Sequence, residues 1–82
     1  MSRFGDLWSK RAADGLDSLP GHLRDQVEAL VRELCADPSG PLAVAVPGLD
    51  RTWMAQISEV AVFYQIDHDG LLVYVTRVEW RP

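Results

Sequence analysis

The chain has 82 residues and a net charge of −4, with 48% hydrophobic and 24% charged residues. This composition is typical of a globular domain and excludes a disordered chain. The length predicts one domain over residues 1–82, with a small core that buries only about 60% of the unfolded surface. One lysine and seven arginines lie scattered among twelve acids. That argues against general nucleic-acid binding, because clustered cations supply most of such affinity through counterion release.

The single cysteine, Cys35, cannot form an intrachain disulfide, which favours a reducing, cytoplasmic setting. No hydrophobic run approaches the roughly 18 residues of a membrane-spanning helix. The N-terminus also lacks a basic start followed by an apolar block, as a secretory signal would have. The sequence therefore predicts a cytoplasmic protein with no membrane contact.

Two helices are predicted first along the chain. The first follows apolar residues at helical spacing, Trp8, Ala12, Leu16 and Leu19, and ends at Pro20. The second carries an apolar stripe from Leu23 to Leu34 and ends before Asp37-Pro38, since a residue that precedes proline is pushed out of the helical region. Because very few residues join them, the two helices should form an antiparallel hairpin, followed by a loop over residues 37–41.

Strands fill the second half of the predicted fold. Residues 42–46 lie between two prolines and are at best an edge strand. Residues 52–57, 60–66 and 71–78 are rich in β-branched and aromatic residues, and Asp69-Gly70 is a strong hairpin signal. Residues 2–7 form either a frayed edge strand or no strand. The sequence thus predicts an α+β fold, an N-terminal helical hairpin packed on a three- to four-stranded antiparallel sheet.

Placing Ile66 opposite Leu71 assigns the two faces of this sheet. The face predicted to pack under the helices carries aliphatic side chains and one tyrosine, namely Val60, Val62, Tyr64, Ile66, Leu71, Val73 and Val75, with Trp53 and Ile57 beside them. The other face carries Met54, Phe63, Leu72, Tyr74 and Trp80. A contiguous apolar and aromatic surface often marks a binding site, so we expect these five residues to bind a protein partner or, without one, a second copy of the chain.

The order of these elements resembles the RelE/ParE superfamily of toxins from type II toxin–antitoxin systems. The resemblance covers residues 8–81 and rests on the helical hairpin, a loop ending in Pro47-Gly48-Leu49, the strand Val62-Phe63-Tyr64-Gln65-Ile66 and the Asp-Gly turn. In that superfamily the RelE branch cleaves messenger RNA in the ribosomal A site, the ParE branch inhibits DNA gyrase, and both are silenced by an antitoxin. The resemblance therefore implies an antitoxin partner, and the ribosome or gyrase as target.

The residues of a RelE-type nuclease are mostly missing. Such enzymes use no metal and hold phosphate with lysines and arginines on the uncovered face of the sheet. The strand that should carry the lysines has Thr52, Met54 and Gln56 instead, and the position of a typical arginine is Ala61. The remaining candidates for catalysis are Arg51, Arg77 and Arg81, although Arg77 falls on the helix-facing side in the predicted register.

Other chemistry is weakly indicated. Asp67-His68-Asp69-Gly70 resembles the start of a calcium loop, but the later ligands are missing, so a hairpin turn is the better interpretation and we expect no metal or cofactor. Cys35 with His22 or His68 would be a thiol pair, yet Cys35 ends an apolar helix face and is more simply a buried residue. Glu59 and Glu79 lie on adjacent strands with no sign of a pocket between them.

Three functions follow. The preferred one is a RelE/ParE-like toxin that acts mainly by binding proteins, either its antitoxin or a cellular target, and not as an enzyme. The second is a metal-independent, ribosome-dependent endoribonuclease that uses the three arginines. The third is a non-toxic dimerisation or scaffold domain. A short neighbouring gene for a DNA-binding segment with an amphipathic tail would favour the first two.

Overall fold

The computed structural model describes residues 3–82. Its elements in chain order are β1 (Gly5–Trp8), α1 (Lys10–Asp17), α2 (Gly21–Ala36), β2 (Val44–Ala45), β3 (Trp53–Ile57), β4 (Val60–Asp67) and β5 (Leu72–Trp80). Residues 3–82 form one five-stranded sheet in the order β1-β5-β4-β3-β2. Neighbouring strands are antiparallel except β1, which runs parallel to β5.

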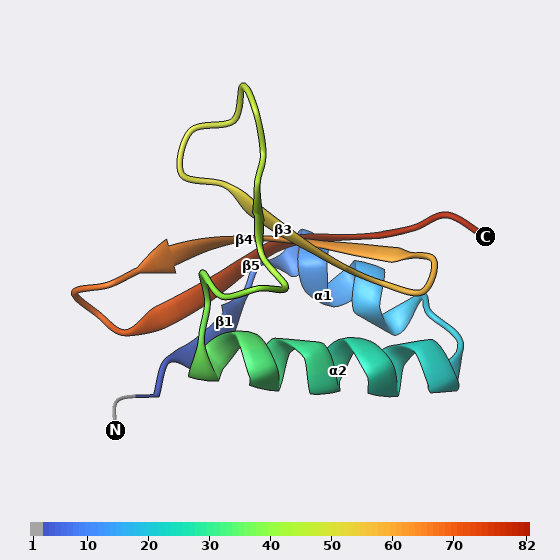
Figure 1. Ribbon diagram of the computed structural model, residues 1–82. Coiled ribbons are helices and arrows are strands. Elements are labelled where there is room, and N and C mark those ends of the chain that lie inside the picture. The colour runs from blue at the N-terminus through green and yellow to red at the C-terminus, as the bar shows by residue number, and fades with distance from the viewer. Residues whose placement is uncertain (1–2) are drawn as a thin grey trace.

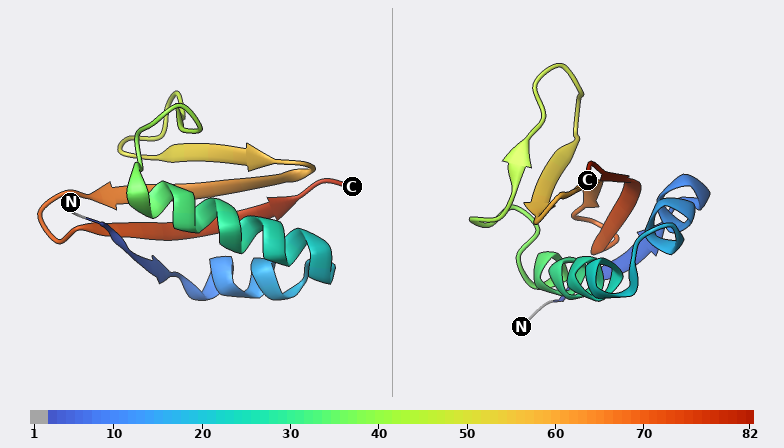
Figure 2. Two further views of the ribbon diagram at one scale, coloured as in Figure 1. Left: turned by 60° about the horizontal axis from the view of Figure 1, so that its bottom comes forward. Right: turned by 90° about the vertical axis from the view of Figure 1, so that its right-hand side faces the viewer.

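Both helices lie on one side of the sheet, and the loop between β2 and β3 projects away from them (Figure 1). α1 packs against β5, while α2 crosses the sheet diagonally (Figure 2). The predicted fold class, α+β with a helical hairpin packed on an antiparallel sheet, is confirmed, and the one parallel pairing among the described strands is that of β1 with β5. None of the helices within residues 3–82 is long and apolar enough to cross a membrane.

The first helix starts later than its apolar spacing predicted. Ser9 is its N-cap: the Ser9 hydroxyl accepts the Ala12 backbone N–H at 3.0 Å and donates to the Thr76 carbonyl at 3.0 Å. Such a cap satisfies a backbone donor that the helix itself leaves free. Trp8, which we expected in the helix, is instead the last residue of β1.

The second helix confirms its predicted stripe. Pro20 is the residue before its first turn, and the helix ends at Ala36 because Asp37 precedes Pro38. Its buried residues are Leu23, Val27, Leu30, Val31, Leu34 and Cys35. These side chains pack on the aliphatic face of the sheet, which is also as predicted.

Tyr64 is the largest fully buried side chain of the core. Its hydroxyl donates a 2.6 Å hydrogen bond to the Pro38 carbonyl, which satisfies the one polar atom that the side chain takes into the core. Burial, aided by the negative charge of Asp37, raises the pKa of Tyr64 to about 12. The bond ties the loop after α2 to the middle strand. The placement of Val62, Tyr64 and Val73 in the core is confirmed.

The sheet has more strands than the predicted three or four. β1 pairs with β5, its neighbour in space but not in sequence, and the Phe4 backbone N–H donates to the Cys35 carbonyl at 2.8 Å. The strand was ambiguous in the sequence because it is short and contains Gly5. Of the residues 2–7 left open there, Ser2 lies outside the described residues.

The β4–β5 turn is longer than predicted. Ile66 lies opposite Val73 and not opposite Leu71. The Asp67 carboxylate accepts the Gly70 backbone N–H at 2.9 Å, and Leu71 adopts a left-handed conformation with φ 53°. An aspartate that bonds the backbone ahead of it builds such a turn, which displaced Leu71 from the predicted face.

A β-bulge makes the second correction to the register. Tyr64 lies opposite Val75 while Phe63 lies opposite Arg77, so Thr76 is an extra residue in β5. An extra residue reverses the alternation of side chains beyond it. Val78 is therefore buried in the core, although unbroken alternation from Tyr74 would place it on the uncovered face.

Candidate functional site

The side of the sheet away from the helices is called the open face below. Its centre is a row of directly paired residues that crosses four strands. Val44 lies opposite Met54, Met54 opposite Phe63, and Phe63 opposite Arg77. Directly opposed residues of antiparallel strands project to the same side and touch one another. The row is thus a continuous apolar strip that ends in a guanidinium group.

A second apolar group lies on β1 and β5. Leu7 pairs with Tyr74, and Leu72 is on the same side of β5 as Tyr74. Leu7 is 54% exposed and Tyr74 is 36% exposed, so both side chains remain partly open to solvent. Large apolar side chains that remain in water next to one another commonly mark a docking surface.

Four of the five residues predicted to bind a partner lie on the open face: Met54, Phe63, Leu72 and Tyr74. The fifth, Trp80, does not. Because the bulge at Thr76 reverses the alternation, Trp80 lies opposite the core residue Val60, is 38% exposed, and donates its indole N–H to Glu59 of the β3–β4 turn at 3.4 Å. The sequence analysis missed Val44 and Leu7, whose exposure depends on which strands form the sheet edges.

The bulge also moves Arg77, which the predicted register placed toward the helices. Arg77 is on the open face with its guanidinium carbon 5.9 Å from the centroid of the Phe63 ring. It makes a 3.0 Å ion pair with Glu79. Arg81 donates from Nε to the same carboxylate at 2.7 Å. Two of the three arginines predicted as catalytic candidates are therefore brought together, but around a carboxylate.

Arg51, the third candidate, lies apart from this cluster. It sits in the loop before β3 with φ 60° and lines a hollow with Gln65, Leu72 and Tyr74. The open face of β3 carries Met54 and Gln56, as predicted, so no lysine projects from it. Arg51 is therefore separate from Arg77 and Arg81, and the adjoining open face of β3 offers Met54 and Gln56.

A hollow of about 480 Å³ adjoins the arginine cluster. Its lining residues are Met54, Gln56, Ser58, Glu59, Ala61, Phe63, Glu79 and Arg81. Glu59 and Glu79 thus share a hollow that the sequence did not indicate. Hydrogen bonding from Arg81, with further attraction from Arg77, lowers the pKa of Glu79. A carboxylate stabilised as the anion is a poor proton donor, which argues against an acid–base pair.

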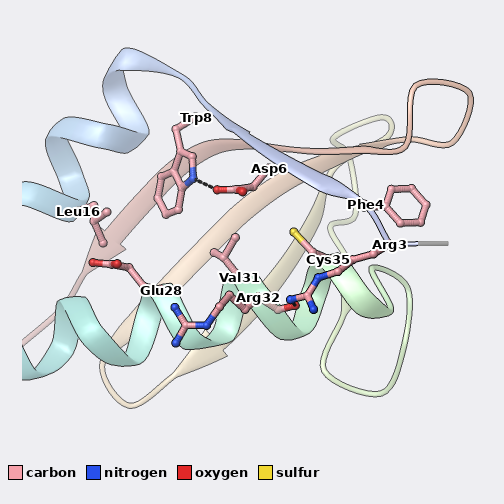
Figure 3. Close-up of a pocket in the computed structure, with 9 residues that line it drawn as sticks. All are labelled: Arg3, Phe4, Asp6, Trp8, Leu16, Glu28, Val31, Arg32 and Cys35. Atoms are coloured by element: carbon pink, nitrogen blue, oxygen red, sulfur yellow. Dashed lines mark hydrogen bonds between the residues drawn. The ribbon is translucent and has the colours of Figure 1, made fainter. Parts of the chain in front are cut away.

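A second hollow, of about 400 Å³, lies on the helix side between β1 and α2 (Figure 3). The Trp8 indole donates to the Asp6 carboxylate at 2.6 Å, and Cys35 lines the opposite wall. Burial, followed by the charge of Asp6, raises the pKa of the Cys35 thiol. A thiol held protonated is a weak nucleophile. The histidines are elsewhere, because His22 is exposed on α2 and His68 stacks edge-on against Phe4 in the turn region.

Comparison with known proteins gives the same fold. The toxin–antitoxin complex RelBE2 from Mycobacterium tuberculosis superposes with a TM-score of 0.85 at 21% identity, over 96% of this chain and 99% of that chain. The intact RelBE complex of E. coli gives 0.83 at 17% identity, over 96% and 98%. A YoeB/ParE toxin from Agrobacterium tumefaciens gives 0.82 at 14% identity, over 96% and 100%. These identities show likeness of fold.

No curated protein sequence matches the chain. A protein-family model, described as the ParE toxin of the type II toxin–antitoxin system parDE, matches residues 7–81 and so covers nearly all of it. The predicted resemblance is confirmed. The chain belongs to the ParE toxin family of type II toxin–antitoxin systems, within the RelE/ParE fold.

Proposed function

We propose that this toxin acts by binding proteins through the open face, first its antitoxin and, when free of it, a cellular target. The observation that carries the proposal is the apolar row Val44, Met54 and Phe63, continued by the exposed Leu7 and Tyr74. The helices bury the other side of the same sheet. Among residues 3–82, the open face carries the exposed large side chains Leu7, Val44 and Tyr74, which a partner could cover.

The physics of this face suits an extended or helical segment of a partner. Such a segment loses conformational entropy when it folds on the toxin, and it recovers that cost by burying apolar area. Tyr74 offers a large ring with a polar end, a residue type enriched among those that dominate binding energy. The RelE proteins of E. coli and Mycobacterium tuberculosis have been crystallised in toxin–antitoxin complexes, which supports an antitoxin as the partner here.

For the cellular target we propose a protein as well. Membership of the ParE family supports DNA gyrase, the target of that branch, over the ribosome. The alternative, ribosome-dependent messenger cleavage, gains one supporting observation: the bulge at Thr76 places Arg77 on the open face with Arg81. Because Glu79 binds both guanidinium groups, messenger cleavage remains the second candidate function.

The proposal is tested by titrating the purified toxin with the protein encoded next to its gene. Tyr74→Asp places a charge in the exposed group that Tyr74 forms with Leu7 and should weaken binding about 100-fold or more, as loss of an aromatic hot-spot contact does. The matched control is Leu71→Asp. Leu71 is similarly exposed, at 40%, but lies in the turn, so binding should change by less than about threefold for a residue outside the interface.

Two results would contradict the proposal. Wild-type affinity of Tyr74→Asp would exclude the open face. Equal weakening by Tyr74→Asp and Leu71→Asp would indicate a non-specific effect of added negative charge. Circular dichroism of each variant must first show an unchanged fold. If the neighbouring protein did not bind the wild-type toxin at all, the third function, that of a dimerisation or scaffold domain, would be favoured.

A further inference from the structure

The Arg77, Glu79 and Arg81 cluster has a feature that protein binding does not explain. Beyond the bulge these residues alternate along the chain, so all three side chains project from the same side. One carboxylate, Glu79, receives both guanidinium groups, at 3.0 Å from Arg77 and 2.7 Å from Arg81. Glu79 is also the least exposed of the three, with 21% of its side chain accessible against 45% and 83% for the arginines.

Each arginine is fixed by a second contact. The Arg77 guanidinium lies 5.9 Å from the centroid of the Phe63 ring, within the range of a cation–π interaction. The backbone N–H of Arg81 donates to the Glu59 carbonyl at 2.9 Å, which continues the strand pairing beyond β5. The Arg77 guanidinium is therefore held against the sheet, Arg81 is anchored through its backbone, and both guanidinium groups converge on Glu79.

Two guanidinium groups that converge on one point form an oxyanion site, because their N–H groups match the oxygens of a carboxylate or a phosphate. We infer that Glu79 occupies this site from within the chain and thereby keeps the phosphate groups of nucleic acid off the open face. The inference concerns the arginine cluster alone and does not depend on the proposed protein partners.

Glu79 should bind the two arginines in strong preference to a phosphate group from solution. Its carboxylate is attached within two residues of both arginines, so its effective concentration is far above that of any phosphate in solution. The pKa of Glu79 is lowered, first by the hydrogen bond from Arg81, so the carboxylate stays ionised over the physiological range. A chain of net charge −4 offers an incoming polyanion little long-range attraction to offset this.

Removing the internal anion should therefore create a phosphate site. The probe is a fluorescein-labelled single-stranded RNA of about ten nucleotides, a length within the usual site size of single-strand binders. In about 50 mM salt, Glu79→Gln should bind it roughly three- to tenfold more tightly than wild type, with a salt dependence steeper by about one unit of slope. Adding Arg77→Ala and Arg81→Ala to Glu79→Gln should return both values to the wild-type level.

Glu59→Gln is the matched control. It removes the same charge from the same hollow, but no ion pair joins Glu59 to either arginine among the contacts within residues 3–82. It should leave RNA binding near the wild-type level. Equal tightening by Glu59→Gln and Glu79→Gln would show that net charge alone matters, and would overturn the inference. No tightening in Glu79→Gln would overturn it as well.

A second measurement detects phosphate binding at the two arginines directly. With inorganic phosphate as the probe, the side-chain Nε signals of Arg77 and Arg81 should shift in the NMR spectrum of Glu79→Gln and stay unmoved in wild type. Shifts of the same size in wild type would mean that Glu79 does not exclude phosphate. Thermal melting of each variant confirms that the fold is retained, since the three side chains lie at the surface.

Discussion

At the scale of single residues, Tyr64 links the core to the loop after α2. Its ring fills the centre of the core, and its hydroxyl is bonded to Pro38. The sequence identified Tyr64 as a core residue from strand alternation alone. It did not identify the bond, because the loop carbonyl that accepts it is 26 positions away in the chain.

The raised pKa of Tyr64 predicts a loss of stability at high pH. The phenol has an ordinary pKa near 10 when unfolded and a pKa of about 12 when folded, so the folded state favours the protonated form. The contribution of Tyr64 to the free energy of unfolding should be constant below pH 10 and fall between pH 10 and pH 12, by at most about 1.4 kcal/mol per pH unit.

Urea titrations at several pH values measure this slope. Tyr64→Phe should remove the fall in stability between pH 10 and pH 12, and it also removes the hydrogen bond to Pro38. Tyr74→Phe alters an exposed phenol and should leave the slope unchanged. If the slope persisted in Tyr64→Phe, the pH dependence would come from groups other than Tyr64.

A second residue-scale prediction concerns Leu30, buried in the stripe of α2. Leu30→Ala should lower the free energy of unfolding by about 2–5 kcal/mol, the range for a leucine removed from a core. Leu42→Ala removes the same atoms from a residue that is 46% exposed, and it should change stability by less than about 0.5 kcal/mol. Equal melting temperatures for Leu30→Ala and wild type would show that the helix does not pack as described.

At the scale of elements, the sequence predicted those in which apolar residues recur with a clear period. It missed features that depend on pairing with strands remote in sequence. The stripe of α2 and its proline boundaries carry their own signal. The bulge at Thr76 carries no such signal, because one extra residue does not produce a recognisable pattern in a short strand of mixed composition. β1 was ambiguous because its pairing with β5 is remote in sequence. These two features decide which residues reach the open face, so the site was predicted less well than the fold.

Gly15 tests the packing of α1 on β5. A Cβ at this position would lie 2.7 Å from the Val78 carbonyl oxygen, a backbone atom that cannot move alone. Gly15→Ala should therefore destabilise the protein by about 1–3 kcal/mol, as overpacking does, although alanine favours a helix.

Gly21→Ala is the control for Gly15→Ala. Gly21 is the first residue of α2 and has open space around it. Its replacement should be neutral or stabilise by up to about 1 kcal/mol. If Gly15→Ala were as stable as Gly21→Ala, the close approach of α1 to β5 would be wrong.

At the scale of the whole molecule, the sheet divides the chain into a helix-covered side, which holds the core, and an open side, which we propose binds partners. The core lies between the sheet and the helices, and the open face carries an apolar strip with one compensated charge cluster. The sequence already predicted this division from alternation. It misplaced residues beyond the bulge, Trp80 and Arg77 among them.

The charge cluster bears on the nuclease alternative. In a translation extract with a defined messenger we expect no A-site cleavage above background, because Met54, Gln56 and Ala61 occupy positions where cationic groups would hold phosphate. Robust cleavage that is lost in Arg77→Ala or Arg81→Ala, but not in Arg51→Ala, would establish the enzyme and contradict this prediction.

The most direct test of the central claim is to map the bound antitoxin by NMR on the toxin with labelled methyl groups. Side chains of the open face should shift when the neighbouring protein is added, with the Met54, Leu72 and Leu7 methyl groups leading. Methyl groups of Leu16 and Val31, which line the hollow on the helix side, should shift much less. The reverse pattern, with Leu16 and Val31 shifted and Met54 unmoved, would place the partner on the helices and contradict the account.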